Sequence, residues 1–450
     1  MLRSPRRVLA ILVCKILIIA AKMLGKRGSA IPGRVAIRIA PDILRSLASQ
    51  VRRGIIVVCG TNGKTTTNNI ICDLLRAKGY KPVCNRLGAN MLNGAVTAFA
   101  DAASIGGGLD ADYACIEADE LWAVRMFEHF KPDYIVMTNL FRDQLDRYGE
   151  VEITLDALKR AAEAADGATL IVNADDPLLV ALSKQYGGKC VYYGVTDGPQ
   201  ESGPTAEIKE GRLCRSCGAE LEYEAYYYSH IGRYFCPDCG FSRPAPEYAA
   251  DNIDLSRGLA FDVGGEHIEL NYRGFYNVYN ILAAYAALSR CGVGAADING
   301  ALAGFSPQIG RMETFTIGDR QVILNLAKNP AGFNQAISAL LADPRAKTAL
   351  IAVNDHESDG RDVSWLWDVD FERLHGITGV IAGGARANDI QVRMKYAGFA
   401  PEEVRISPGI EQGVVSALSY DSEAVYVLVN YTALFSTHDL LYKMAKGPDR

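Results

Sequence analysis

Short apolar runs alternate with amphipathic stretches along most of the chain. The runs are rich in β-branched residues and predict strands, whereas the longer amphipathic stretches predict helices. In the first half, the predicted strands cover residues 55–59, 113–117, 133–138, 169–173 and 189–195, and the predicted helices cover 65–78, 121–129, 154–165 and 178–186. This alternation indicates a parallel sheet with helices on both faces.

A second α/β block is predicted from about residue 312, after a helix at 279–289. Its predicted strands cover residues 322–325, 348–353, 379–382 and 424–429. Residues 196–250 interrupt the alternation, because they are polar and rich in tyrosine and contain four cysteines. We therefore predict an N-terminal helix and linker over 1–50, a central α/β domain over 51–310 with an insertion at 196–250, and a C-terminal α/β domain of Rossmann-like type over 311–450.

The apolar run at residues 8–24 follows three arginines, in the layout of a signal peptide. Lys15 and Lys22 interrupt the run, and no small-residue cleavage site follows it. The uninterrupted stretches are too short to span a bilayer, which needs about 20 apolar residues. We predict an amphipathic or packed helix. Contact with a membrane surface is the alternative interpretation, because basic residues flank apolar ones.

Composition narrows the function classes. Of the 450 residues, 49% are hydrophobic and 22% charged, so the chain can form large cores. The net charge of −5 argues against a nucleic-acid-binding protein, which needs a basic face, although it leaves room for a local basic patch. Eleven cysteines are too sparse for a disulfide scaffold, and their odd number with two C-x₂-C pairs indicates a reducing compartment and a metal site.

A glycine-rich loop follows the first predicted strand. It consists of Gly60, Thr61, Asn62, Gly63, Lys64, Thr65 and Thr66, and a helix is predicted directly after it. Backbone N–H groups of such a turn and of the helix start face an anion. Lys64 would reach the β- and γ-phosphates of a nucleotide, and the Thr65 hydroxyl would bind Mg²⁺. The loop is shorter than the common phosphate loop.

The four cysteines of the insertion form two C-x₂-C pairs. These are Cys214 with Cys217 and Cys236 with Cys239, separated by 18 residues. The spacing is typical of a zinc ribbon. Four thiolates complete a tetrahedral shell and leave no position for water, so the predicted zinc site is structural.

The shortened loop GTNGKTT resembles that of the Mur ligase and folylpolyglutamate synthase superfamily. Further similar segments follow in order, at Glu117, Asn139 (NLFRDQLDRYG), Asn277 with Asn280, Arg311 (GRME) and residues 325–332 (NLAKNPAG). The resemblance implies ATP-dependent amide-bond formation through an acyl phosphate. It also implies that Thr65 and Glu117 bind Mg²⁺ and that the loop, Asn139, Asn277 and Arg311 bind ATP.

Some positions depart from the family pattern. Gln144 stands where Mur ligases have a metal-binding histidine, and Lys328 replaces another histidine. The carbamylated lysine of the family falls near Leu158, one place from Lys159, which leaves a second metal site open. Only about 55 residues precede the predicted strand that leads to the loop, so we do not expect a whole N-terminal domain that holds a UDP-sugar.

An acidic loop with two tryptophans covers residues 354–368, after the predicted strand 348–353. Ligands bind at the carboxyl ends of parallel strands, although a solvated acidic loop at a domain seam is the simpler interpretation. With the Mur core and the cysteine insertion, the pattern NDxxxDGRDxSW resembles the synthetase subunits of lipid II isoglutaminyl synthases. The resemblance implies that Asp362 completes the Cys–His pair of a glutaminase partner, GatD. Asp355 and Asp359 are the alternatives.

The resemblance thus implies amidation of the α-carboxylate of D-glutamate in the lipid II stem peptide, with ATP, Mg²⁺, structural zinc and ammonia from the partner. It places the protein in the cytoplasm and allows peripheral contact with the inner membrane face. A different superfamily ligase that adds an amino acid is one alternative. A zinc-ribbon and phosphate-loop module that binds nucleic acid is another, against which the net charge argues.

Overall fold

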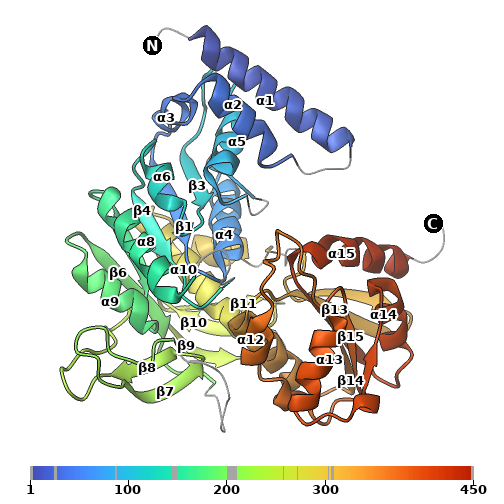
Figure 1. Ribbon diagram of the computed structural model, residues 1–450. Coiled ribbons are helices and arrows are strands. Elements are labelled where there is room, and N and C mark those ends of the chain that lie inside the picture. Colours follow the sequence, from blue (N-terminus) through green and yellow to red (C-terminus); the bar gives the residue numbers. More distant parts are fainter. Residues whose placement is uncertain are drawn as a thin grey trace.

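The computed structural model describes residues 4–24, 28–86, 89–143, 149–199, 210–256, 258–270, 272–302, 304–305 and 309–446. Gln144 lies outside the described residues. Figure 1 shows three regions, namely N-terminal helices, a central sheet below them and a C-terminal domain beside the lower part of the central sheet.

The N-terminal region contains α1 (Pro5–Met23), α2 (Ile31–Ile39) and α3 (Ile43–Ala48). Pro5 at the start of α1 has a backbone angle suited to a first helical turn. One face of α1 is buried against α2 and α5 (Leu92–Ala102). The helix predicted from the apolar run is therefore confirmed. Among the described residues, no helix combines the length and the apolar character needed to cross a membrane.

Nine strands of the described chain form the central sheet in the order β11-β10-β9-β6-β5-β4-β1-β3-β2. They are β1 (Gly54–Cys59), β2 (Pro82–Cys84), β3 (Tyr113–Glu117), β4 (Tyr134–Met137), β5 (Thr169–Asn173), β6 (Cys190–Val195), β9 (Tyr248–Asp254), β10 (Leu259–Val263) and β11 (Glu266–Leu270). The pairs from β2 to β9 are parallel, and β9, β10 and β11 are antiparallel. The parallel part confirms the predicted strands, whereas β2 and β9–β11 were not predicted.

Helices cover both faces of this sheet. On one face, Ile55 and Val57 of β1 pack into a core with α5, α6 (Ala123–Phe127), α8 (Val151–Ala164) and α9 (Pro177–Gln185). On the other face, Ile56 and Val58 join a core with α4 (Lys64–Ala77), α10 (Tyr276–Arg290) and α11 (Ala295–Leu302). Alternate residues of a strand point to opposite faces, so burial on both sides explains why β1 is apolar throughout.

The C-terminal domain has a second sheet in the order β12-β13-β17-β14-β15-β16. Its strands are β12 (Glu313–Ile317), β13 (Arg320–Leu326), β14 (Lys347–Ala352), β15 (Gly379–Gly383), β16 (Val404–Ile406) and β17 (Ala424–Val429), and its helices are α12 (Pro330–Ala342), α13 (Ala387–Tyr396), α14 (Ile410–Leu418) and α15 (Tyr431–Lys446). Only β12 and β13 pair antiparallel. The predicted α/β fold class is confirmed.

The stretch predicted as an insertion contains an antiparallel hairpin of β7 (Glu222–Tyr228) and β8 (Ile231–Phe235). The hairpin lies between the two cysteine pairs. Aromatic side chains give it a core, with Tyr234 stacked on Phe241 and Tyr223 stacked on Tyr226. The central sheet continues at Tyr248, within the range 196–250.

Candidate active site

The glycine-rich loop connects β1 to α4. Gly60 and Gly63 have φ angles of +118° and +82°, in the left-handed region that favours glycine. At Gly63 a Cβ atom would lie 2.0 Å from the Oδ1 atom of Asn280 on α10. The tight contact between α10 and the loop therefore requires glycine at this position.

A cleft of about 750 Å³ opens beside this loop, between the central and C-terminal domains. A volume in this range suits a nucleotide-sized ligand. Nine of the predicted site residues line it, namely Thr61, Asn62, Gly63, Lys64, Thr65, Thr66, Glu117, Asn139 and Arg311. Gly60 and Asn277 do not line it. From the C-terminal domain, Lys328, Glu357 and Arg361 face the same space.

Lys64 is buried and shares its surroundings with Glu120, a residue that the sequence analysis missed. The Nζ atom of Lys64 donates to Oε1 of Glu120 at 2.8 Å and to the carbonyl oxygen of Gly60 at 2.5 Å. Burial alone would lower the pKa of Lys64, but nearby carboxylates, led by Glu120, outweigh it and raise the pKa. The ammonium therefore stays charged. Burial raises the pKa of Glu120.

Thr65 and Glu117 present neighbouring oxygen atoms. The Thr65 hydroxyl donates to Oε2 of Glu117 at 2.8 Å, and Nδ2 of Asn90 lies 3.3 Å from Oε1 of Glu117. Glu117 is held at the end of β3, where its backbone N–H donates to Oδ1 of Asn85 at 2.8 Å. A hydroxyl and a carboxylate oxygen are ligands that Mg²⁺ accepts, so these two residues fit a divalent cation beside a phosphate.

Asn277 and Asn280 lie one turn apart on α10. Nδ2 of Asn280 donates to Oδ1 of Asn277 at 2.8 Å, and Asn277 donates to the carbonyl oxygen of Arg273 at 2.7 Å. Asn280 lines the cleft, whereas Asn277 is buried and is not part of the lining. Asn277 thus orients the amide that contacts the loop.

Polar contacts join the two domains across the cleft. The side-chain amides of Asn62 and Asn329 exchange hydrogen bonds at 3.1 and 3.3 Å, and Asn329 also accepts from Gly332 N–H at the start of α12. Lys328, which replaces a family histidine, forms an ion pair with Asp143. The loop and the C-terminal domain are therefore directly coupled.

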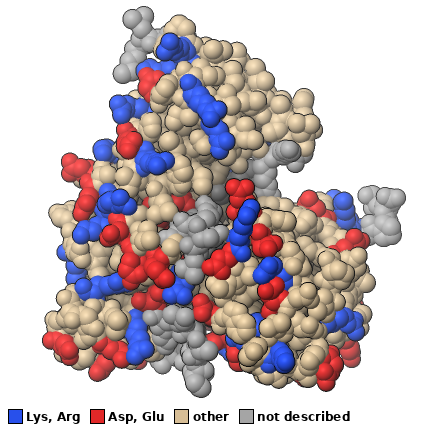
Figure 2. All heavy atoms as spheres, in the orientation of Figure 1, with Lys and Arg blue, Asp and Glu red and all other residues tan. Residues whose placement is uncertain are grey.

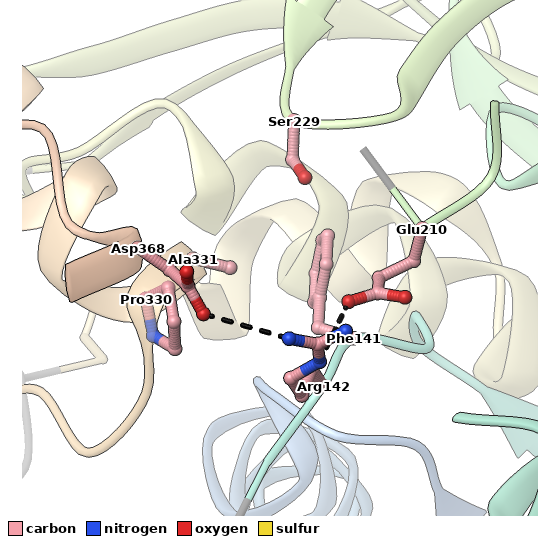
Figure 3. A pocket seen from close by; sticks show the side chains of 7 residues that line it. All are labelled: Phe141, Arg142, Glu210, Ser229, Pro330, Ala331 and Asp368. Carbon is pink, nitrogen blue, oxygen red and sulfur yellow. Dashed lines mark ion pairs between the residues drawn. The ribbon is translucent and has the colours of Figure 1, made fainter. Parts of the chain in front are cut away.

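A smaller pocket adjoins the cleft, since Phe141 and Ala331 line both. Figure 3 shows Arg142 between two carboxylates there. Its Nε atom lies 3.0 Å from Glu210 of the central domain, and another guanidinium nitrogen lies 3.6 Å from Asp368 of the C-terminal domain. Arg142 thus forms a second ionic link between the domains.

The four cysteines of the insertion come together. Their Sγ atoms all lie within 4.8 Å of one another. Gly218 and Gly240, which follow the two pairs, have φ angles of +82° and +74°, as tight knuckles require. Burial raises the pKa of the Cys214 thiol, but hydrogen bonds from backbone N–H groups and neighbouring thiols outweigh it and lower the pKa to about 7. This donor set fits a metal ion that takes thiolate ligands.

The three candidate aspartates of the acidic loop differ in their contacts. Asp359 is buried, and its carboxylate accepts from the backbone N–H of Thr432 at 2.9 Å. Asp355 lies 3.4 Å from Arg386. Asp362 is half-buried at the start of a 3₁₀ turn, Ser364–Asp368, where the backbone N–H of Ser364 holds its pKa below the usual range.

Models of two known protein families match the domains on the two sides of the cleft. The model of the Mur ligase middle domain matches residues 58–227, and the MurT ligase C-terminal model matches residues 326–434. The chain is 35% identical over 433 residues to the MurT subunit of lipid II isoglutaminyl synthase (glutamine-hydrolyzing) from Staphylococcus aureus strain COL, which covers 95% of this chain and 96% of that protein. The chain belongs to the MurT family.

A second MurT relative, from Streptococcus pneumoniae strain ATCC BAA-255 / R6, is 34% identical over 92% of each chain. Among solved structures, a pseudomurein peptide ligase type C from Methanothermus fervidus has a TM-score of 0.70 and 24% identity, covering 88% of this chain and 80% of that one. This likeness shows the Mur ligase fold. The range matched by the middle-domain model contains Lys64 and Glu117, and the range matched by the C-terminal model contains Lys328 and Asp362.

The sequence contained one signal for Glu120. It belongs to a run of acidic residues, EADE, at the carboxyl end of β3, which is the edge of a parallel sheet where ligands bind. The family resemblance drew attention to Glu117 alone. Only the fold shows that the fourth residue of the run reaches Lys64.

We expect Gly63→Ala to prevent nucleotide binding and to destabilise the protein. The matched control is Gly79→Ala, because Gly79 has a φ of +81° but no other atom within 4 Å of the position that a Cβ would take. The control should lose about 1–2 kcal/mol from backbone strain alone. G63A should lose about 1–3 kcal/mol more, because the methyl group must displace Asn280. Denaturant unfolding and titration with an ATP analogue check this, and equal effects of the two variants would contradict it.

Proposed function

We propose that this chain is the ATP-dependent synthetase subunit of a lipid II isoglutaminyl synthase. It would amidate the α-carboxylate of D-glutamate in the lipid II stem peptide, and the product would be D-isoglutamine. The observation that carries the proposal is its identity of 35% to MurT subunits over nearly its whole length, together with an intact phosphate loop and cleft. The reaction would serve peptidoglycan synthesis.

The nucleotide would lie in the cleft with its phosphates on the loop. Backbone N–H groups of residues 64–66, at the start of α4, and the side chains of Lys64 and Arg311 would supply positive charge there. Asn139 would support the loop, since its Oδ1 accepts from the N–H of Asn62 at 2.9 Å. Asn277 would act through Asn280 on the adenine side. Thr65 and Glu117 would hold Mg²⁺, which neutralises charge on the phosphates.

The substrate carboxylate would attack the γ-phosphorus of ATP and form an acyl phosphate with release of ADP. Ammonia would then attack the acyl carbon, and inorganic phosphate would leave as the amide forms. Lys64 and Arg311 would stabilise the negative charge that develops in both steps. Closure of the domains would exclude water, which otherwise hydrolyses the acyl phosphate. The contacts of Asn62, Lys328 and Arg142 across the seam support such closure.

Ammonia would come from a glutaminase subunit of the GatD type docked on the acidic loop. Asp362 would accept a hydrogen bond from the catalytic histidine of the partner and so fix its tautomer. Asp362 suits this role because its carboxylate is half-buried and is oriented by its hydrogen bonds from Ser364. Trp367 and Tyr396, 51% and 72% exposed, form an edge-to-face pair nearby. Exposed aromatic side chains of this kind are typical anchors of protein interfaces.

We also propose that the four cysteines bind zinc as a structural site. The ion would tie the two knuckles around the hairpin β7–β8 and contribute to folding rather than to chemistry. The substrate places the chain in the cytoplasm at the inner face of the plasma membrane, because lipid II carries its peptide on a membrane-anchored lipid.

The decisive experiment is mass spectrometry of lipid II after incubation with the chain, ATP and Mg²⁺. We expect amide formation with ammonium salt alone, and with glutamine only when the glutaminase subunit is present. Addition of an amino acid instead of ammonia would move the chain to the alternative ligase class. Folded, metal-loaded protein that turns over no ATP in any reaction would reject the proposal.

Asp362→Asn should separate the two half-reactions. Glutamine-dependent amidation should fall on the order of 10⁴-fold, as in other triads whose aspartate becomes asparagine. Ammonium-dependent amidation should not change, because Asp362 lies outside the cleft lining. Asp355→Asn is the matched control and should keep both activities. If D355N loses glutamine-dependent activity and D362N keeps it, the assignment of the triad aspartate is wrong.

Metal analysis tests the zinc site. The purified chain should contain about one equivalent of zinc, and Cys236→Ser should lose it and lower the unfolding midpoint by roughly 5 °C or more. Cys291→Ser, outside the cluster, should keep the metal. Iron in place of zinc, or the same metal content in both variants, would count against the assignment.

A further inference from the structure

The outward face of α1 is apolar along its whole length. Its large side chains recur every three or four residues, as Leu9, Leu12, Ile16, Ile19 and Met23, with exposed fractions of 50%, 38%, 54%, 55% and 84%. Leu24 and Ile31 continue the exposed apolar surface to the start of α2. We call these seven residues the α1 stripe. Contiguous exposed apolar surface of this kind marks an interaction site on a soluble domain.

The α1 stripe is distinct from the face of α1 that packs on the rest of the protein. The opposite face of α1 already packs on α2 and α5 through Ala10, Ile11, Cys14 and Ile18. The helix is also tied at Arg7, which pairs with Asp42 before α3. A helix that is apolar on both faces needs apolar contacts on each face, and the described part of the chain supplies them on one face.

Charge indicates what covers the other face. Nine of the 47 basic residues and none of the 52 acidic residues lie in residues 1–41, so this segment carries +9 and the remainder of the chain −14. Arg6, Lys22, Arg34 and Arg38 are exposed on α1 and α2. In the view of Figure 2, the surface of α1 is mostly apolar or uncharged with basic side chains on it, and acidic side chains gather lower in the molecule. Apolar side chains flanked by basic ones match an anionic lipid surface.

The same region borders the cleft. Ser29 and Ala30, between α1 and α2, line it together with Met91 and Gly94 at the start of α5. The cleft lining therefore extends from the phosphate loop to the segment between α1 and α2, and Figure 1 shows α1 above the central sheet. A peptide that hangs from a lipid in the bilayer would enter the cleft at this point.

We propose that the α1 stripe inserts into the interface of an anionic phospholipid bilayer and holds the cleft mouth against it. The direction of the cleft rests on the proposed function, but binding to the bilayer does not. A second copy of the chain fits the stripe less well, because pairing would bring two segments of charge +9 together. Basic side chains would lie at the phosphate headgroups, and Ile16 and Ile19 would lie among the acyl chains nearest the interface.

The test is flotation of the full chain with vesicles that contain no lipid II. Vesicles with phosphatidylglycerol should bind the chain at least tenfold more tightly than vesicles of phosphatidylcholine alone, and salt should weaken the binding. Ile16→Glu with Ile19→Glu should reduce binding more than tenfold. Val392→Glu with Val415→Glu is the matched control, because these residues of α13 and α14 are 48% and 55% exposed and gain the same charge.

The outcomes are separable. Thermal unfolding reports whether the I16E/I19E variant is folded. Absence of flotation by the native chain, or equal binding by both double variants, would overturn the proposal. Loss of a dimer in I16E/I19E without any vesicle binding would assign the stripe to a second copy. Amidation of detergent-solubilised lipid II should be the same for I16E/I19E and the native chain. Absence of that activity in the native chain would reject the proposed function and leave the vesicle result standing.

Discussion

A lysine and a glutamate that share one buried site hold the phosphate loop in place. Lys64 donates to carbonyl oxygens of its own loop and to Glu120, and Glu120 also accepts from the N–H of Gly60. Removing one partner from a buried ion pair costs about 3–5 kcal/mol, because a charge is left unpaired. The loop is therefore organised before nucleotide binds. A phosphate that reaches Lys64 exchanges one anionic partner for another, so the ammonium is never buried alone.

The interface between the central and C-terminal domains is held by weaker contacts than the buried ion pair of the phosphate loop. Its links are polar, with paired amides at Asn62 and Asn329 and ion pairs at Lys328 and Arg142. Such contacts are individually weak where water reaches them, and interfaces of this type allow domains to move. A site that must admit a peptide, close over a reactive intermediate and then release the product needs a seam of this kind. The rigid sheets on either side keep the reacting groups in register during the movement.

Sequence patterns predicted the parts that depend on local rules. Parallel strands such as β1 are apolar throughout because both faces are buried, and the loop and cysteine knuckles carry glycines at left-handed positions. The strands β9–β11 were missed because they alternate buried and exposed residues within a polar stretch. Spacing could not distinguish Asn277 from Asn280, which are one turn apart, or identify Glu120. Spacing also could not show that the Asp359 carboxylate accepts hydrogen bonds from Thr432, 73 residues away.

The segregation of charge gives the molecule a direction. A net charge near −14 over the folded domains would repel an anionic bilayer, whereas +9 over residues 1–41 would be attracted to it. The long axis of α1 would therefore lie along the bilayer, and the domains would point away from it. Ser29 and Ala30, between α1 and α2, line the cleft, so this orientation would also set the depth of the active site below the lipid headgroups. A membrane-anchored substrate diffuses in the two dimensions of the bilayer. An enzyme that binds the same bilayer through α1 would meet this substrate with its cleft already oriented toward it. One requirement would then explain three features, namely the α1 stripe, its basic flanks and the position of the cleft. The requirement is that the phosphate loop reaches a peptide that cannot leave the membrane.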